Sequence, residues 1–463
     1  MKHALALSLL LAGCSVPQSR PEIAPLVPEA VGLLDGAMAP AVALDWWRGY
    51  GDPQLDRVVE DALAGSPSLD AAEARVRQAD AALSRQDAER GPSVDLDGQL
   101  QAARLSGRYT IPPPYAGTVR VQGIGQAGLD WNLDLFGRQR AAIEQAAGQR
   151  DAAAFDAAAA RVMISSAVVQ AYAEIARAER QAAIAREALA TREASLRLTE
   201  ARVRGKLASE IDTAGAQTLV AQAQVALARA EGARKLATQA VAALAGRGAD
   251  YASGIGPTHL VGTGPDLPAT IPVDLLSRRA DVSAAQARAA AAAAGRQVAR
   301  RAFYPNVNLS AFAGIQAIGI GNLLSLDAGT AGAGAAIHLP LFDNGRLKAD
   351  LAGATAGVDV ATANYNDTVV TAVRETADAI ARLQAISRER EAQREAVAGL
   401  AKVGKLNAVR VRAGLNSRLD LIDTDIRLLD ARQAEENLAI DAIVARAQLA
   451  QALGGGFESE SRP

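Results

Sequence analysis

Two hydrophobic patterns follow each other along this chain, and the pair occurs twice. Four segments alternate apolar and polar residues with a period of two, at about residues 93–106, 118–131, 306–317 and 329–340. This alternation predicts β-strands that have one apolar face. Each pair of strands leads into a long stretch without proline, from Tyr115 to Gly256 and from Leu341 to Arg462.

The proline-free stretches are predicted to form long helices. Residues 138–204 and 346–412 are rich in Ala, Arg, Glu, Gln and Leu, which favour helices, whereas an internal proline costs about 3 kcal/mol. At 1.5 Å per residue, each helix would be about 100 Å long. A short break follows each one, and return helices are expected over 209–245 and 417–453. The fold class is therefore mainly α, with two long antiparallel helical hairpins and four strands.

The chain is an internal duplication. Gly137-Arg138 recurs as Gly345-Arg346 and Arg202-Val203-Arg204 recurs as Arg410-Val411-Arg412, both at an offset of 208 residues. The second copy has two extra residues, Asp343 and Asn344, just before the first of these landmarks. An offset that holds between the landmarks indicates that a rigid element of constant length joins them.

Composition favours a thin layer of helices. Only 3% of the residues are aromatic, and small side chains let helices approach closely but fill a thick core poorly. A coiled coil or a spectrin-like bundle would nevertheless show the same helical pattern. The formal net charge is −2, so there is no electrostatic case for binding nucleic acid.

The strand pattern is compatible with a membrane barrel. Transmembrane strands alternate apolar outward and polar inward residues, although soluble hairpins alternate in the same way. Four strands cannot close a barrel, and an open edge in lipid would leave backbone groups unpaired. If these strands lie in a membrane, several chains must share one barrel, and three chains would supply twelve strands.

The N-terminus is typical of a bacterial lipoprotein. Lys2 and His3 precede an apolar run, Ala4–Ala12, which is too short to span a membrane as a helix and ends at Gly13-Cys14. Residues 1–13 are therefore expected to be a cleaved signal peptide, with Cys14 acylated and residues 14–40 forming a tether. The covalent lipid on Cys14 is the only non-protein group expected, and stable anchoring requires more than one acyl chain. Cys14 is the single cysteine, so no disulfide can form within the chain.

Several motifs together resemble the outer-membrane efflux protein family, the TolC-like outer-membrane factors, and in particular their lipoprotein branch that serves RND pumps. The resemblance covers about residues 41–457, and its most specific parts are the Trp-to-Arg motif and the segment with two adjacent arginines. The motifs are Trp46-Trp47, Trp131–Arg138, Leu275–Val282, Phe303-Tyr304-Pro305, Leu339–Arg346 and Ala452–Phe457.

The resemblance implies a homotrimer with a 12-strand outer-membrane barrel and a 12-helix periplasmic tunnel. Its implied partners are a periplasmic membrane-fusion adaptor, an inner-membrane RND pump and outer-membrane lipid. The organisation expected along the chain is a first repeat, an equatorial linker, a second repeat and a short tail, at 41–250, 251–272, 273–457 and 458–463.

The resemblance also places a periplasmic gate where the last helix begins. The positions that match are Leu419, expected to form an apolar constriction, and Asp423, expected to form an acidic ring, with Asp420 and Asp425 as weaker candidates. Asp212 and Asp420 each follow a serine by three residues, so they are also candidates for helix capping. The remaining expected tip and partner-contact residues are Arg202, Arg204, Gly205, Asp212, Arg410, Arg412 and Gly414.

No enzymatic site is predicted. Gly123–Gly128 has the spacing of a dinucleotide fingerprint, but it lies inside an alternating segment instead of between a strand and a helix. Only His259 and His338 remain after the leader, with no cysteine beside them for a metal or a nucleophile. The alternative to a channel is a periplasmic adaptor or a structural coiled-coil lipoprotein. The exported substrate cannot be read from these residues.

Overall fold

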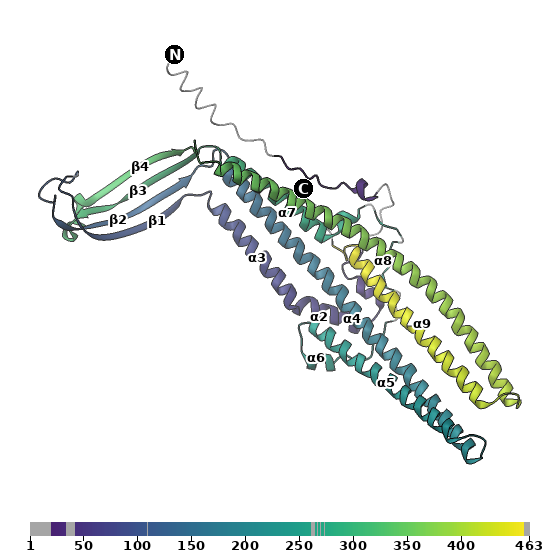
Figure 1. The fold of residues 1–463 in the computed structure, drawn as a ribbon. Coiled ribbons are helices and arrows are strands. Elements are labelled where there is room, and N and C mark those ends of the chain that lie inside the picture. Colours follow the sequence, from purple (N-terminus) through teal and green to yellow (C-terminus); the bar gives the residue numbers. More distant parts are fainter. Residues whose placement is uncertain are drawn as a thin grey trace. The chain divides into compact units, whose positions relative to one another are not determined.

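The computed structural model describes residues 20–33, 42–108, 110–260, 264–265, 267–268, 270–272 and 274–457. The predicted leader, Cys14 and the C-terminal tail lie outside the described residues. The main elements (Figure 1) are α2 Pro53–Gly65, α3 Pro67–Ala88, β1 Ser93–Arg104, β2 Val119–Asn132, α4 Arg138–Arg204, α5 Glu210–Leu244, α6 Ala249–Ser253, α7 Ala280–Arg301, β3 Asn306–Ile318, β4 Gly329–His338, α8 Arg346–Arg412 and α9 Arg418–Ala452. Short 3-10 turns η1 to η5 lie at Pro28–Val31, Trp46–Tyr50, Leu275–Arg278, Ile320–Asn322 and Leu326–Ala328.

The duplication is visible in the helices. Both α4 and α8 have 67 residues, and both α5 and α9 have 35. All four pairs of helix ends keep the 208-residue offset that the sequence motifs show. The long helices cover the ranges expected from proline exclusion, and each return helix is one residue shorter at each end because its flanking residues are caps.

The chain forms two compact units. The described residues of the sheet unit fall within 20–25, 75–153 and 285–365, and those of the helical unit fall within 26–74, 154–284 and 366–457. The sheet unit contains all four strands, and the helical unit contains the turns that end the hairpins.

The strands form one antiparallel sheet in the order β1-β2-β3-β4. The two repeats meet at its centre, where β2 pairs with β3 and Trp131 lies opposite Leu309. In the part of the chain that the structure describes, no further strand pairs with the outer edges of β1 and β4. The sheet is therefore open at both edges.

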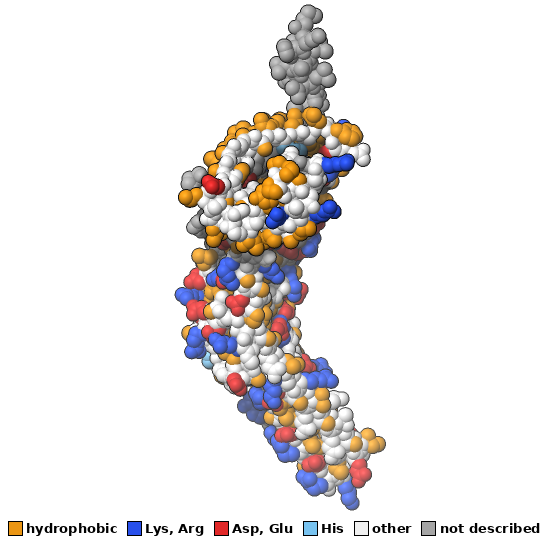
Figure 2. Space-filling model, turned by 90° about the vertical axis from the view of Figure 1, so that its left-hand side faces the viewer, with side chains coloured by type: hydrophobic (Ala, Val, Ile, Leu, Met, Phe, Trp, Pro, Cys, Tyr) orange, Lys and Arg blue, Asp and Glu red, His pale blue; other side chains and the backbone are white. Residues whose placement is uncertain are grey.

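One face of the sheet carries exposed apolar side chains. Val94, Leu96 and Leu100 on β1 are 68%, 83% and 64% exposed, and Ile337 on β4 is 73% exposed. Figure 2 shows hydrophobic side chains along the rim of the strand region. A surface of this kind marks contact with lipid or protein.

The turn from strand to long helix explains the two extra residues in the second repeat. In the first repeat, Asp134 accepts hydrogen bonds from the Gln139 and Arg140 amides at 2.9 and 3.0 Å, which caps α4. The second repeat has proline at the position 206 residues later, and proline has no carboxylate. Asp343 in the insertion replaces it, because its side chain accepts from the Gly345 and Leu347 amides at 3.1 and 2.8 Å.

Part of the apolar stretch of α4 lies in the core of the helical unit. Among the described helices, α4 alone is long and apolar enough to cross a membrane by length and composition. Its Val168, Tyr172 and Ile175 are fully buried, however, in a cluster with Trp46 and Leu55. Contact with other segments of the chain therefore accounts for part of this apolar stretch, of which 33% is buried.

A buried carboxylate, Asp52, joins three segments of the helical unit. Its Oδ1 accepts from the Gln54 amide at 2.9 Å and caps α2. Its Oδ2 accepts from the Tyr172 hydroxyl on α4 and from the His259 amide in the linker, both at 2.7 Å. Because Asp52 is only 1% exposed, these bonds replace the water that the charge would otherwise need.

The segment with two adjacent arginines contains a buried side chain, Arg279, that connects three helices. Arg279 is 7% exposed, and its guanidinium donates to Asp281 at 3.0 and 2.6 Å and to Glu375 on α8 at 2.9 Å. It also donates to the Ala452 carbonyl at the end of α9, at 3.1 Å. One side chain therefore ties together α7, α8 and α9 within the helical unit.

We expect Arg279→Ala to lower the free energy of unfolding by about 2–3 kcal/mol, because it removes the buried guanidinium that joins two carboxylates and the Ala452 carbonyl. Denaturant unfolding followed by circular dichroism measures the change. Arg374→Ala is the control: its partner Asp378 is 67% exposed, so the loss should stay within about 0.5 kcal/mol. Equal effects of the two variants would contradict the role assigned to Arg279.

Candidate functional site: the two helix turns

The two hairpin turns have the same backbone hydrogen bonds. After α4, the Lys206 and Leu207 amides donate to Val203 O and Arg202 O at 2.9 and 2.8 Å. After α8, Gly414 and Leu415 do the same at 3.0 and 2.8 Å, to the carbonyls 208 residues later. Such bonds satisfy the last carbonyls of a helix.

The left-handed residue of the first turn is Lys206 and not Gly205. Lys206 has φ +56° and its equivalent Gly414 has φ +73°, whereas Gly205 aligns with Ala413. Glycine adopts this conformation without steric cost, but lysine does not. Alignment of the two repeats, more than the position of a glycine, identifies the strained residue.

Both acids that follow a serine by three residues complete capping boxes. Asp212 accepts from the Ser209 amide and hydroxyl at 2.8 and 2.9 Å. Asp420 accepts from the Ser417 amide at 3.0 Å, while its own amide donates to the Ser417 hydroxyl at 3.2 Å. The two side chains are exposed, and their geometry is that of helix starts.

Asp423 lies one turn further along α9 and has a partner that the sequence analysis missed. Its Oδ2 is 2.8 Å from Arg427 Nη2, and the two side chains are 59% and 70% exposed. Leu419 is half-buried on the preceding turn. The equivalent positions of the first repeat are Ile211, Gly215 and Leu219. The ion pair therefore belongs to the second repeat alone.

A polar chain also distinguishes the second hairpin. The Asn407 amide on α8 donates to the Thr424 hydroxyl on α9 at 2.8 Å, and Asn416 donates to Asn407 Oδ1 at 3.3 Å. The first repeat has Thr199, Ala216 and Ala208 at these positions, which cannot form the same chain. The difference between the two repeats at these three positions is the sequence signal by which these residues could have been identified.

The four tip arginines are exposed, and Arg202 and Arg412 each donate only to a nearby carbonyl, at 3.4 and 3.3 Å. Among the described residues none of the four forms an ion pair. Exposed apolar side chains lie beside them: Leu207, Ile211 and Leu415 are 73%, 83% and 70% exposed. Both turns therefore present apolar groups flanked by unpaired cations.

A polar seam joins the two hairpins within the helical unit. Along α4 and α9, Arg177 contacts Asp441 at 2.8 Å and Arg180 contacts Glu436 at 2.7 Å. Nearer the tips the seam weakens, because Arg432 is 3.9 Å from Glu187. Burial, together with the Glu187 carboxylate, raises the pKa of Asp425 on α9.

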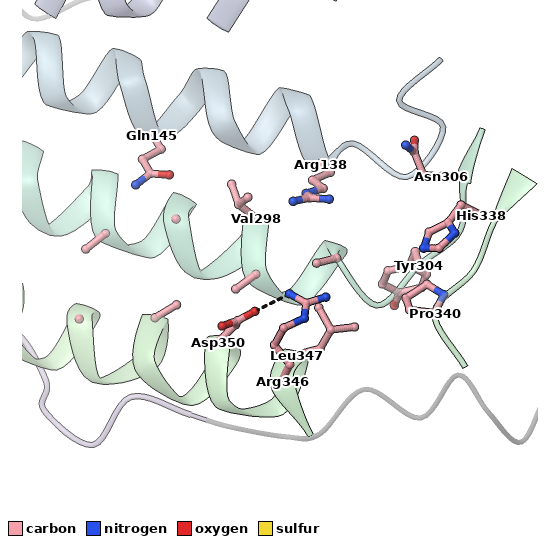
Figure 3. A pocket seen from close by; sticks show the side chains of 16 residues that line it. Arg138, Gln145, Val298, Tyr304, Asn306, His338, Pro340, Arg346, Leu347 and Asp350 are labelled. Carbon is pink, nitrogen blue, oxygen red and sulfur yellow. Dashed lines mark hydrogen bonds and ion pairs between the residues drawn. The ribbon is translucent and has the colours of Figure 1, made fainter. Parts of the chain in front are cut away.

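The sheet unit contains a polar cavity. This cavity has a volume of about 520 Å³ and is lined by Arg138, Tyr304, His338 and an Arg346–Asp350 ion pair of 3.1 Å (Figure 3). No group of three or more potential metal ligands occurs among the described residues. The features that distinguish this chain chemically lie at its turns.

An open membrane-type sheet followed by long helical hairpins defines a class of outer-membrane channel proteins with a helical extension. The chain belongs to the outer membrane efflux protein family, whose model matches residues 58–247 and 271–455 and so covers both repeats. Proteins of this family are conduits and not enzymes. The chain is accordingly an outer-membrane protein of a Gram-negative bacterium.

Two curated relatives and one solved structure show the extent of the similarity. The fusaric acid resistance protein FusA of Burkholderia cepacia is 34% identical over 76% of this chain and 69% of its own length. The multidrug resistance outer membrane protein MdtP of Escherichia coli K12 is 28% identical over 98% and 96%. The outer membrane protein VceC of Vibrio cholerae is 34% identical, with a TM-score of 0.82 over 90% of this chain and 100% of its own.

The capping boxes lead to a prediction about pH. The hydrogen bonds from Ser209 lower the pKa of Asp212 below its ordinary value of 3.8. A depressed pKa means that the cap stabilises the helix start above about pH 3.8 and is lost as the pH falls through the lower, folded-state value.

Protection of the first-turn amides of α5 against hydrogen exchange should therefore fall severalfold below pH 3.8, relative to the intrinsic rates. In Asp212→Ala it should be low at every pH. The exposed neighbour Glu210 provides the control, because Glu210→Ala should keep the pH dependence of the wild type. A pH-independent wild type would contradict the capping interpretation.

Proposed function

We propose that three copies of this chain form the outer-membrane channel of a tripartite RND-type efflux system. The observation that carries the proposal is the open four-stranded sheet with an exposed apolar face, in a chain that continues into two 67-residue helices. The sheet has two open edges that must pair with strands of other chains, and the helices form the proposed periplasmic extension.

Barrel closure supports the trimer. A lipid environment offers no water to the unpaired groups on the outer edges of β1 and β4, so those edges must pair with other strands. Pairing β1 of one copy with β4 of the next closes the sheet without any new element. Three copies give twelve strands, within the range of known barrels.

The proposed transport is passive. The channel provides a water-filled path, and an inner-membrane RND pump supplies the energy through a periplasmic adaptor. The names of FusA and MdtP refer to resistance to fusaric acid and to several drugs, which supports small organic molecules as the exported class. The exposed apolar and cationic groups at the turns, Leu207, Arg204, Leu415 and Arg412, are proposed to contact the adaptor.

We place the gate at Leu419 and Asp423, at the start of α9. Three-fold symmetry would bring three copies of each side chain around the axis. The Arg427 partner changes the expected electrostatics, because each Asp423 charge is accompanied by a cation at 2.8 Å. The ring is therefore proposed to be closer to neutral than three carboxylates alone would be.

Opening is proposed as a movement of the α8–α9 hairpin along its seam with α4. Contacts of 2.7 and 2.8 Å hold the seam far from the tips, and the α4–α9 ion pair nearest the tips among the described residues is Arg432–Glu187, at 3.9 Å. The raised pKa of Asp425 indicates that its charged form is disfavoured there. The tip end of the seam is thus the part that separates most easily.

The lipid anchor at Cys14 remains a proposal based on the leader sequence. Together with the barrel, it would hold the chain in the outer membrane.

The proposed function predicts a trimeric mass in detergent and single-channel conductance in planar bilayers. Small and rarely opening steps would support a gated tunnel. A purified, folded protein with a monomeric mass and no conductance would contradict the shared barrel and favour the adaptor or structural-lipoprotein alternative.

Truncating the gate should enlarge the opening. We expect Leu419→Ala/Asp423→Ala to raise single-channel conductance at least twofold, because it removes both the apolar constriction and the charged ring. The matched control is Ile211→Ala, at the position equivalent to Leu419 in the first repeat. If the control raises conductance as much as the double variant, closure is shared by both turns and is not specific to α9.

A further arm of this experiment tests the charge balance of the ring. Arg427→Ala removes the cation beside Asp423, so the reversal potential in a salt gradient should shift towards cation selectivity. An unchanged reversal potential would place Asp423 away from the conducting path.

A further inference from the structure

The segment that follows the predicted lipidation site lies along α8 and is held through its backbone. The Glu22 and Ile23 amides both donate to Asp359 Oδ1, at 2.8 and 2.9 Å. The Leu26 amide donates to Asn366 Oδ1 at 2.7 Å. Each contact lies within a single unit, the first two in the sheet unit and the third in the helical unit.

The spacing of these contacts matches an extended chain against a helix. Asp359 and Asn366 are seven residues apart on α8, which places them on the same face and separates them by about 10 Å. From Ile23 to Leu26 an extended chain spans about 10 Å as well. The segment and the helix run in the same direction, so the end that leads to Cys14 points towards the start of α8.

Proline prepares the segment for this path. Pro21, Pro25 and Pro28 have fixed φ angles and restrict the residues before them to extended conformations. An extended segment loses little conformational freedom when it docks, so a few hydrogen bonds can hold it. At its far end, Leu33 is 7% exposed and adds a buried contact.

We propose that Asp359 and Asn366 form a docking rail that fixes the register of residues 22–26 on α8 and thereby the reach of the acylated Cys14. The rail itself is independent of the proposed function, whereas its effect on the anchor rests on the proposed lipidation and membrane location. The two side chains of the rail bind main-chain amides of residues 22–26. The rail therefore fixes where this segment lies on α8 and does not select particular side chains in it.

With this register, the segment from Cys14 to Glu22 is only a little longer than the distance it must span to the start of α8. From Glu22 back to Cys14 there are eight residues, which span at most about 28 Å. From Asp359 to the first residue of α8 there are thirteen, which rise about 20 Å along the helix. If Glu22 instead docked at Asn366, the distance would grow to about 30 Å and Cys14 could not reach the membrane end of the helix.

The rail predicts protection of the Glu22–Ile23 peptide bond from a glutamyl endopeptidase, because both of its flanking amides are held. We expect cleavage of Asp359→Ala/Asn366→Ala in outer-membrane fractions to be at least tenfold faster than that of the wild type. The appearance of a chain that begins at Ile23 measures it. Alanine is a strong helix former, so α8 should remain intact.

Two variants make the comparison specific. Asp359→Asn keeps an oxygen acceptor and should retain most of the protection. Asp367→Ala removes an exposed acid of the same helix that has no hydrogen bond in the described structure, and it should cleave at the wild-type rate. Equal cleavage of the double variant and the wild type would overturn the rail.

A deletion tests the register. Removing Val16–Ser19 shortens the reach by about 14 Å, so an acylated Cys14 should pull residues 22–26 off the rail and speed cleavage at Glu22. Adding Cys14→Ser to the deletion should restore protection. Unchanged protection in the lipid-labelled deletion variant would overturn the link between rail and anchor.

Labelling with radioactive palmitate separates this result from the proposed function. If Cys14 carries no label while the double variant still loses protection, the proposed anchor is wrong and the rail stands. If the bilayer shows no conductance while the protection pattern is as expected, the channel proposal fails by itself.

Discussion

Two unpaired strand edges constrain this protein more than any other feature. A sheet with free edges at β1 and β4 and an exposed apolar face is stable in lipid only if neighbouring chains complete it. That requirement explains how a sheet that has four strands in the described part of the chain can be part of a closed barrel. It also makes the barrel and the helical extension parts of one assembly, because each strand pair continues directly into a long helix.

The helices of this protein share only a small hydrophobic core, so polar contacts between segments contribute more to its stability than they would beside a large core. Alanine buries little surface per residue, so the helical unit relies on a few polar residues at points where several segments meet. Asp52 joins α2, α4 and the linker, and Arg279 joins α7, α8 and α9. The contact between α4 and α9 combines both kinds of interaction, because the Arg177–Asp441 and Arg180–Glu436 pairs lie beside a buried cluster of Ala173, Ala176 and Ile440.

Duplication makes the differences between the repeats informative. The first repeat caps its long helix with Asp134, whereas the second uses Asp343 from its two-residue insertion. The polar chain through Asn407 and the Asp423–Arg427 pair occur only in the second hairpin. The polar chain and the ion pair lie near the turn where the gate is proposed, while the lengths of the hairpin helices are the same in the two repeats.

The sequence by itself determined the secondary structure with unusual accuracy. Proline exclusion and a constant offset located Arg138–Arg204 and Arg346–Arg412, because an interruption anywhere in a long helix would change its length or its composition. Period-two alternation located the strands to within two residues, and the resemblance supplied the candidate gate positions. Proline exclusion, strand alternation and repeat length depend on neighbouring residues or on the repeat itself, so they can be read from a single sequence.

Only the tertiary structure decided which side chains meet. The i,i+4 spacing allows Asp423 to pair with Arg427, but no pattern in the sequence brings the backbone of Glu22 to Asp359 or joins Asp52 to Tyr172. Such contacts depend on rotamers, on turn geometry and on segments more than 300 residues apart. The physical reason is that hydrophobic periodicity specifies which face of an element is buried, whereas a hydrogen bond requires two particular atoms to lie about 3 Å apart.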